Sequence, residues 1–235
     1  MARGLACAGV VRTVSIDSSV AGQKPIQQKI GLPNNPININ EYATCPERQP
    51  AGTARYISQL ERNNAAGFQG NWASSYSLHD YFANILGKPG ANEGENQQEG
   101  SVSGYWPNSE WLVYQYYHLN MTGQRLQTTA SGDEIWDMYA TYDSETGFVK
   151  VLAGIRYHPG TYIITINNLT SVGLPSSGSV SVHTYHFDWE NNIFENDGFS
   201  PADQGPSVHS YMGGSLTFGV GASNLTAYAF EFSYK

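Results

Sequence analysis

A short strand that ends on a carboxylate is the feature that most limits how this chain can fold. In residues 36–43 isoleucines alternate with asparagines as far as Asn40, and Glu41 follows directly. The preceding residues 31–36 are turn formers rich in glycine, proline and asparagine. In an α/β barrel, residues at the carboxyl ends of the strands line the active site. Glu41 is therefore a candidate catalytic residue.

Helical and extended segments alternate after this strand as far as about residue 130. Residues 53–63 carry apolar side chains at helical spacing. Residues 67–72 are typical of a second short strand that ends on Trp72, and residues 108–120 predict an aromatic-rich helix. This order of elements is that of a strand–helix–strand–helix unit.

The rest of the chain is patterned as strands and turns. Apolar residues alternate with other residues in 149–155 and 162–166, and Tyr228, Phe230 and Phe232 share one face of the last run. Turns rich in glycine or proline separate these short strands, a pattern that predicts an antiparallel β-sandwich. We therefore divide the chain into an N-terminal segment, residues 1–130, and a sandwich domain, residues 131–235.

The order of these motifs resembles the C-terminal part of clan A retaining glycoside hydrolases, nearest to family 39 and its fungal relatives. The motifs that carry the resemblance are Asn40-Glu41-Tyr42 at a strand end, Leu60-Glu61-Arg62 in the next helix, and Asn71-Trp72 at the next strand end. In those enzymes the glutamate that ends the seventh strand is the nucleophile. The resemblance implies that role for Glu41.

The same resemblance implies an α+β chain in two parts. Residues 1–130 would be a partial (β/α) barrel remnant, namely strands 7 and 8 with their helices, and an antiparallel β-sandwich would follow. A complete (β/α)₈ barrel takes about 250 residues, and the residues before Glu41 are too few for strands 1 to 6. We therefore expect a fragment of a longer enzyme.

Several side chains near Glu41 are candidate sugar contacts. Trp72 would offer an aromatic face to a pyranose ring, and Asn40, Tyr42, Asn71 and Tyr76 would flank it. The alternative for Trp72 is packing beneath the adjacent helix. The expected partner is a carbohydrate, either an oligosaccharide or a glycoside.

Catalysis by a retaining glycosidase needs a second carboxyl group about 5–5.5 Å from the nucleophile. The other Asn-Glu pair, Asn92-Glu93, lies in a glycine-rich stretch and not at a strand end. We therefore expect no turnover by this chain alone. Two other interpretations are a carbohydrate-binding sandwich and a structural protein that self-associates through exposed barrel edges.

Charge and motif content exclude several other classes of protein. A net charge of -8 argues against a nucleic-acid partner, and no apolar run is long enough for a membrane helix. The sequence has no cofactor-binding motif. His183 and His186 lie three apart in a predicted strand, so their side chains point to opposite faces and predict no metal site.

The resemblance implies a secreted glycoprotein, and the localisation signals in the sequence itself are mixed. Three glycosylation sequons begin at Asn120, Asn168 and Asn224, and the N-terminal residues form only a weak signal peptide. Cys7 and Cys45 are the only cysteines, and they allow one disulfide or none.

Overall fold

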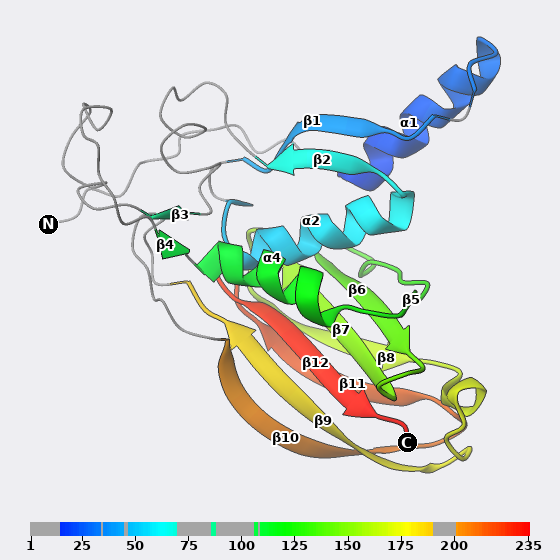
Figure 1. Cartoon of the computed structure of the whole chain (residues 1–235), viewed down its shortest axis with the longest axis vertical. Helices are drawn as coiled ribbons and strands as arrows, with labels where there is room; N and C mark the ends of the chain where they lie inside the picture. Colours follow the sequence, from blue (N-terminus) through cyan, green and yellow to red (C-terminus); the bar gives the residue numbers. More distant parts are fainter. Residues whose placement is uncertain are drawn as a thin grey trace, which may run out of the picture.

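The computed structural model has an α+β fold in which helices lie on a large antiparallel sheet (Figure 1). It describes residues 15–33, 35–44, 47–69, 86–87, 106–107, 109–189 and 201–235. Within these ranges no closed barrel forms. The elements are α1 (Ile16–Lys29), β1 (Asn38–Tyr42), α2 (Pro50–Asn63), β2 (Ala66–Gln69), β3 (Leu86–Gly87), β4 (Trp106–Pro107), α4 (Ser109–Asn120), β5 (Gln124–Arg125), β6 (Trp136–Asp143), β7 (Phe148–Ile155), β8 (Gly160–Ile166), the 3₁₀ turn η2 (Leu169–Val172), β9 (Gly178–Phe187), β10 (Ala202–Tyr211), β11 (Leu216–Ala222) and β12 (Ala227–Ser233).

Two antiparallel sheets enclose the largest apolar core. One has six strands in the order β10-β9-β12-β7-β6-β5, and the other pairs β11 with β8. Val151 of β7, Ile164 of β8, Leu216 of β11 and Phe230 of β12 all belong to the core between these sheets. The antiparallel strands predicted for this half of the chain are therefore confirmed.

The aromatic stripe of the last strand faces this core. Tyr228, Phe230 and Phe232 are buried, and Tyr234 is partly buried against the same cluster. Phe230 packs edge-on against Phe218 of β11, with ring centroids 5.3 Å apart. The alternation read from the sequence therefore assigned the inward face of β12 correctly.

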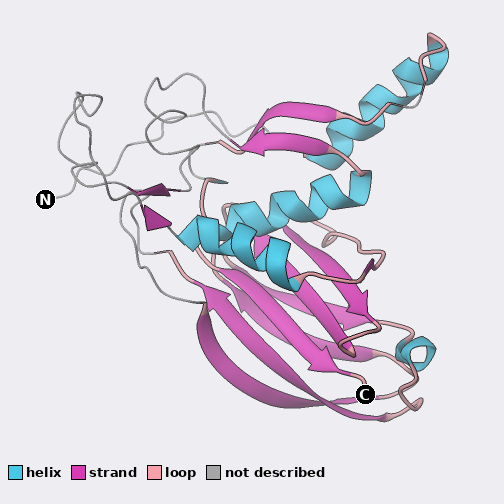
Figure 2. Ribbon diagram, in the orientation of Figure 1, coloured by secondary structure: helices cyan, strands magenta, loops and turns pink. Residues whose placement is uncertain are grey.

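The opposite face of the six-stranded sheet is covered by helices α2 and α4 (Figure 2). Leu152 of β7 and Ala229 of β12 lie in a second apolar cluster with Ile57 of α2 and Val113 of α4. Alternation along a strand shows that one face is buried, but it does not show what covers the other face. Here both faces of the central strands are buried, because the N-terminal helices pack directly on the sandwich.

Gly154 allows the close approach of α2 to the sheet. A Cβ atom at this position would lie 2.0 Å from the carbonyl oxygen of Ala51 and 3.0 Å from the Cβ atom of Ala54. Backbone atoms of a helix cannot yield to such a contact as the end of a flexible side chain could. The glycine in β7 therefore sets how closely α2 packs on this strand.

Beyond α2, a third apolar cluster joins α1 to the small parallel sheet of β1 and β2. Ile16 and Val20 of α1 pack with Ile37, Tyr42 and Tyr56. The sequence did not predict α1, because its residues are mostly polar and include Pro25. Its start is marked by a capping box at Ser15, whose side chain accepts a hydrogen bond from the backbone N–H of Ser18 at 3.1 Å.

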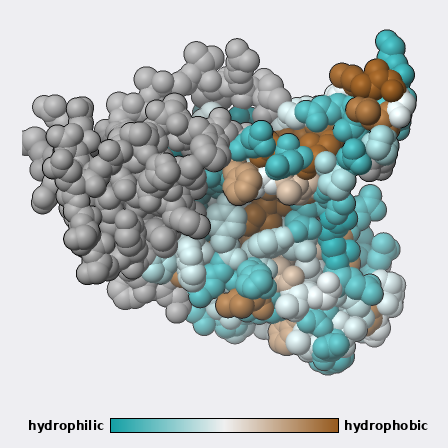
Figure 3. Space-filling view, turned by 45° about the horizontal axis from the view of Figure 1, so that its top comes forward, coloured by the Kyte–Doolittle hydropathy of each residue, from teal (hydrophilic) through white to brown (hydrophobic). Residues whose placement is uncertain are grey.

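The far end of α1 exposes apolar side chains. Ile26, Ile30 and Leu32 are all exposed, and Figure 3 shows a hydrophobic group at this end of the molecule, at upper right. The two-stranded sheet beside α1 also leaves one side of β1 and one side of β2 without a strand partner among the described residues. This part of the molecule therefore carries apolar surface and open strand edges together.

Candidate functional site

The carboxyl ends of β1 and β2 meet at one edge of the small sheet. The two strands are parallel, and Tyr42 at the end of β1 pairs with Gln69 at the end of β2. Gly67 permits this approach, since a Cβ atom there would lie 2.8 Å from the carbonyl oxygen of Ile39. The arrangement of two neighbouring parallel strands, each followed by a helix, is the one that the sequence predicted.

Of the six predicted site residues, three lie at the end of β1. Glu41 is the residue before the last in β1, and the side chain of Asn40 is exposed. Asn71, Trp72 and Tyr76 lie outside the described residues. The roles assigned to these residues, including the nucleophile at Glu41, remain predictions.

Tyr42 is placed within the fold rather than on its surface. Its ring lies 5.0 Å from that of Tyr56 between centroids, and its hydroxyl is 3.0 Å from the hydroxyl of Tyr114. Burial raises the pKa of the Tyr42 hydroxyl to about 12, so it stays protonated at neutral pH. In this arrangement the Tyr42 side chain packs β1 against α2 and α4. Its role as a sugar contact remains a prediction.

A chain of buried polar groups runs beneath the two strand ends. The Tyr114 hydroxyl donates to Oε1 of Gln69 at 2.8 Å, and the amide nitrogen of Gln69 donates to Oε1 of Glu110. Thr53, in the first turn of α2, donates to the same carboxylate oxygen at 2.5 Å. These bonds connect the start of α2, the end of β2 and the first turn of α4, so they position the edge where β1 and β2 end.

Glu110 is the titratable group at the centre of this chain. Its side chain is fully buried, and Oε2 has no hydrogen-bond partner among the described residues. Burial raises the pKa of this carboxyl group to about 7, although hydrogen bonds from Thr53 and Gln69 and the charge of Arg48 act to lower it. The group therefore exchanges a proton near neutral pH. Because it is buried, its contact with the end of β2 runs through Gln69.

Substitution Glu110→Gln should remove a pH dependence of stability. The folded-state pKa lies above the ordinary value of 4.5, so folding favours the protonated form, and stability falls as pH rises towards 7. From about pH 5 to about pH 8 the wild-type chain should lose about 2–3 kcal/mol more than the variant. Urea unfolding of both chains at several pH values measures the difference, and parallel pH profiles would contradict the assignment.

A second buried carboxylate, Glu47, follows β1 and is fully engaged. Its Oε2 accepts hydrogen bonds from the backbone N–H and the hydroxyl of Thr44 at 2.8 and 2.7 Å. Its Oε1 accepts from the Tyr56 hydroxyl at 2.7 Å and pairs with Nε of Arg156 at 2.5 Å. Burial alone would raise the pKa of Glu47, but these hydrogen bonds and the charge of Arg156 outweigh it and lower the pKa. Glu47 therefore stays ionised and fastens the loop after Glu41 to the end of β7.

Sequence reasoning missed Glu47, Gln69 and Glu110. Glu110 follows Ser109 at the start of a helix, where an acidic residue normally interacts with the free N–H groups and with water. Glu47 lies in a polar stretch with no periodic pattern. Only their tertiary partners distinguish these carboxylates from surface ones, so no local signal would have found them.

The described residues offer neither a metal-binding cluster nor a membrane-spanning helix. No group of three or more histidine, cysteine, aspartate or glutamate side chains there could hold a metal ion. No helix in the described part of the chain is both long and apolar enough to span a membrane.

No protein-family model matches this sequence, and no curated protein is significantly similar to it. Solved structures are similar in fold. The protein N2152 from Neocallimastix frontalis aligns with a TM-score of 0.71 and 20% identity, over 94% of this chain and 50% of that one.

Two glycoside hydrolases give weaker matches. The Paenibacillus polymyxa xyloglucanase of glycoside hydrolase family 44, solved with xyloglucan, has a TM-score of 0.53 and 12% identity over 92% of this chain and 35% of its own. The family 39 enzyme from Xanthomonas axonopodis pv. citri has a TM-score of 0.50 and 9% identity, over 95% of this chain and 50% of its own. The chain thus spans half or less of the length of these three proteins. Its fold is that of a part of glycosidase-like structures.

Proposed function

We propose that this chain is a glycoside hydrolase-like protein that corresponds to the C-terminal part of a retaining glycosidase, nearest to family 39. The observation that carries the proposal is the parallel pair β1 and β2, with Glu41 at the carboxyl end of β1 and a helix packed on the sandwich after each strand. The likeness in fold to glycoside hydrolases supports it. In this proposal residues 1–130 are the barrel remnant, residues 131–235 are the sandwich domain, and the protein is secreted.

Glu41 would occupy the position of the nucleophile, and Asn40, Tyr42, Asn71, Trp72 and Tyr76 would bind the sugar. A retaining mechanism also needs an acid/base carboxyl group that can reach the glycosidic oxygen. Among the described residues up to 130, the other carboxylates are engaged or buried. The carboxylate of Asp17 pairs with Arg62, and that of Glu61 pairs with Arg125. The carboxylate of Glu47 pairs with Arg156, and that of Glu110 is fully buried. We therefore propose that the chain alone does not complete the double displacement.

The test is a panel of aryl β-xylosides, β-glucosides and β-glucuronides, assayed with the wild-type chain and with Glu41→Gln. Neither should release the aryl group, because protonation of the leaving group requires a suitably placed acid. The same glycosides should bind weakly in ligand-observed NMR, and Glu41→Ala should reduce that signal. Turnover that disappears in Glu41→Gln would show an active enzyme, and binding that ignores Glu41 would remove this residue from the site.

The alternative is a carbohydrate-binding or structural protein without catalysis. Under this alternative and under the proposed function alike, the exposed apolar end of α1 favours self-association. Open strand edges pair readily with other chains. Static light scattering over a range of concentrations should show dimers or larger species. Ile26→Asp together with Ile30→Asp should shift the population towards monomer, because both side chains are exposed and contribute apolar surface. A wild-type chain that stays monomeric at all concentrations would contradict this expectation.

A further inference from the structure

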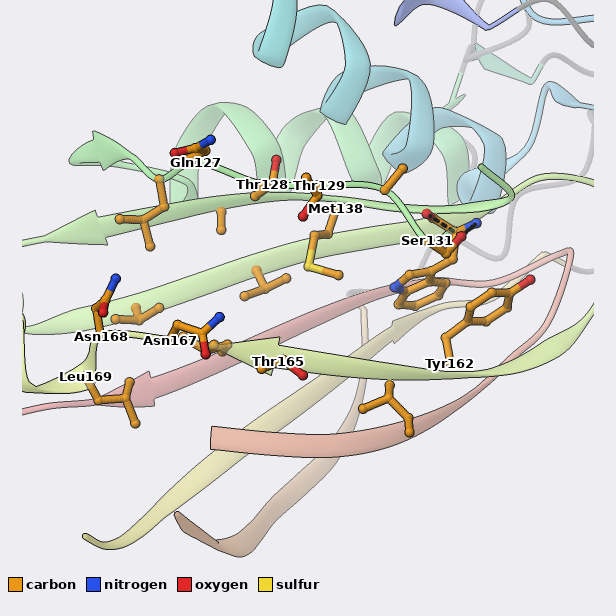
Figure 4. Close-up of a pocket in the computed structure, with 18 of the residues that line it drawn as sticks. Gln127, Thr128, Thr129, Ser131, Met138, Tyr162, Thr165, Asn167, Asn168 and Leu169 are labelled. Carbon is orange, nitrogen blue, oxygen red and sulfur yellow. Dashed lines mark hydrogen bonds between the residues drawn. The ribbon is translucent and has the colours of Figure 1, made fainter. Parts of the chain in front are cut away.

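A cleft of ≈ 790 Å³ opens between the two sheets of the sandwich (Figure 4). One rim is the segment 126–132, which follows β5, and the other is formed by β8 and residues 167–172. β8 pairs with β11 on one side, and no described strand pairs with its other side. The volume falls within the roughly 300–1,000 Å³ of small-molecule sites.

The cleft is polar at its rims, apolar at its floor and without charge. Figure 4 shows Gln127, Thr128 and Thr129 on one rim and Asn167 and Asn168 on the other. Of the described residues that line the cleft, none is acidic or basic. The floor includes side chains of the sandwich core such as Val149 and Val151.

Several of these polar groups have hydrogen-bonding capacity to spare. The side chains of Gln127 and Thr129 are exposed, and neither forms a hydrogen bond with another described residue. An amide group offers two donors and an acceptor, and a hydroxyl group offers one donor and two lone pairs. The rim can therefore both donate to and accept from an uncharged ligand.

Trp136 provides a second, independent observation in the same cleft. Its side chain lines the cleft and is only 1% exposed, yet its Nε1 has no hydrogen-bond partner among the described residues. Its ring stacks on Tyr162 at 5.5 Å between centroids and 9° between planes, which holds the indole in place. An unpartnered buried donor is destabilising, and a ligand oxygen would relieve it.

We propose that this cleft binds a short neutral oligosaccharide. Hydroxyl-rich ligands match the amides and hydroxyls of the rim, and their C–H faces match the apolar floor and the aromatic stack. A charged ligand would find no counter-charge there. The site is built by β6, β7, β8 and the segment 126–132, so it is separate from the strand ends of β1 and β2 and does not depend on Glu41.

The test uses the full chain with cellohexaose and xylohexaose as probes, followed by ligand-observed NMR and tryptophan fluorescence. At least one of the two should bind. The double variant Gln127→Ala with Thr129→Ala should bind it about tenfold more weakly, the effect of losing two uncharged hydrogen bonds. Both substitutions are at exposed positions, so the melting temperature should not change.

The matched control is Gln204→Ala with Thr217→Ala, the same residue types at exposed strand positions outside the cleft. This control should bind the oligosaccharide as the wild type does. Absence of binding to both oligosaccharides would overturn the proposal. Binding weakened only by Glu41→Gln would assign the sugar to the strand ends. Binding of an uncharged threonine–valine hexapeptide in place of the sugar would identify the cleft as a peptide-binding strand edge.

Discussion

Replacing Phe230 by alanine is expected to lower the free energy of unfolding by about 3–5 kcal/mol. The side chain is 4% exposed and packs in the core between the two sheets, where Phe218 and Tyr228 are its aromatic neighbours. Its strand pairs with β7 on one side and β9 on the other. A cavity at this position would remove contacts from both sheets. β12 cannot move inwards to fill it without breaking its pairing with β7 and β9.

The matched control is Phe68→Ala in β2. Phe68 is 63% exposed, so its truncation creates no cavity and should cost far less than that of Phe230. Urea unfolding of the two variants beside the wild type gives both values. A loss below about 1 kcal/mol for Phe230→Ala would mean that the inward face of β12 had been assigned wrongly.

Removing the carboxylate of Glu47 is expected to destabilise the chain by a similar amount, about 3–5 kcal/mol. Glu47 is 2% exposed and accepts hydrogen bonds from Thr44 and Tyr56 while it pairs with Arg156. In Glu47→Ala these donors lose their shared acceptor, and the guanidinium group loses its neutralising charge. The loop between β1 and α2 would then lose its anchor on the sandwich.

An exposed ion pair between α2 and β5 provides the comparison. Arg125 and Glu61 are 3.4 Å apart and partly exposed, so Arg125→Ala should cost at most about 1 kcal/mol. The effect of Glu47→Ala should also shrink in acid. The folded-state pKa of Glu47 is lowered, so its contribution is present above the unfolded pKa and is lost as pH falls through the folded one. Equal costs for the two variants at neutral pH would show that Glu47 carries no special role.

The elements that the sequence predicted best are those whose pattern is local. Alternation in residues 149–155 corresponds to β7, and the aromatic run of residues 228–234 corresponds to β12 and the residue after it. The strand that leads to Glu41 and the helix that follows it were also placed correctly, as β1 and α2. Each of these segments repeats at the period of its own secondary structure, so a window of a few residues is enough to recognise it.

The helix α1 and the second face of β7 were missed for the opposite reason. α1 is held by a capping box and by only two buried apolar side chains, Ile16 and Val20, and its sequence contains Pro25. Leu152 and Gly154 lie within the expected strand, but their contacts come from α2, far away in the sequence. A periodic pattern shows which side chains are shielded from water. It does not show which element of the fold shields them.

By itself, the sequence determined the strand–helix–strand–helix order of β1, α2, β2 and α4, the inward face of the last strand and the place of Glu41 near a strand's carboxyl end. Tertiary structure alone decided which carboxylates are buried. Thr53 and Gln69 reach Glu110 across 57 and 41 residues of sequence, and Arg156 reaches Glu47 across 109. Desolvation and hydrogen bonding set the pKa of a carboxyl group, and both depend on which distant side chains surround it. Burial beneath the packed helices therefore raises the pKa of Glu110, whereas hydrogen bonds from Thr44 and Tyr56 and the charge of Arg156 outweigh the burial of Glu47 and lower its pKa.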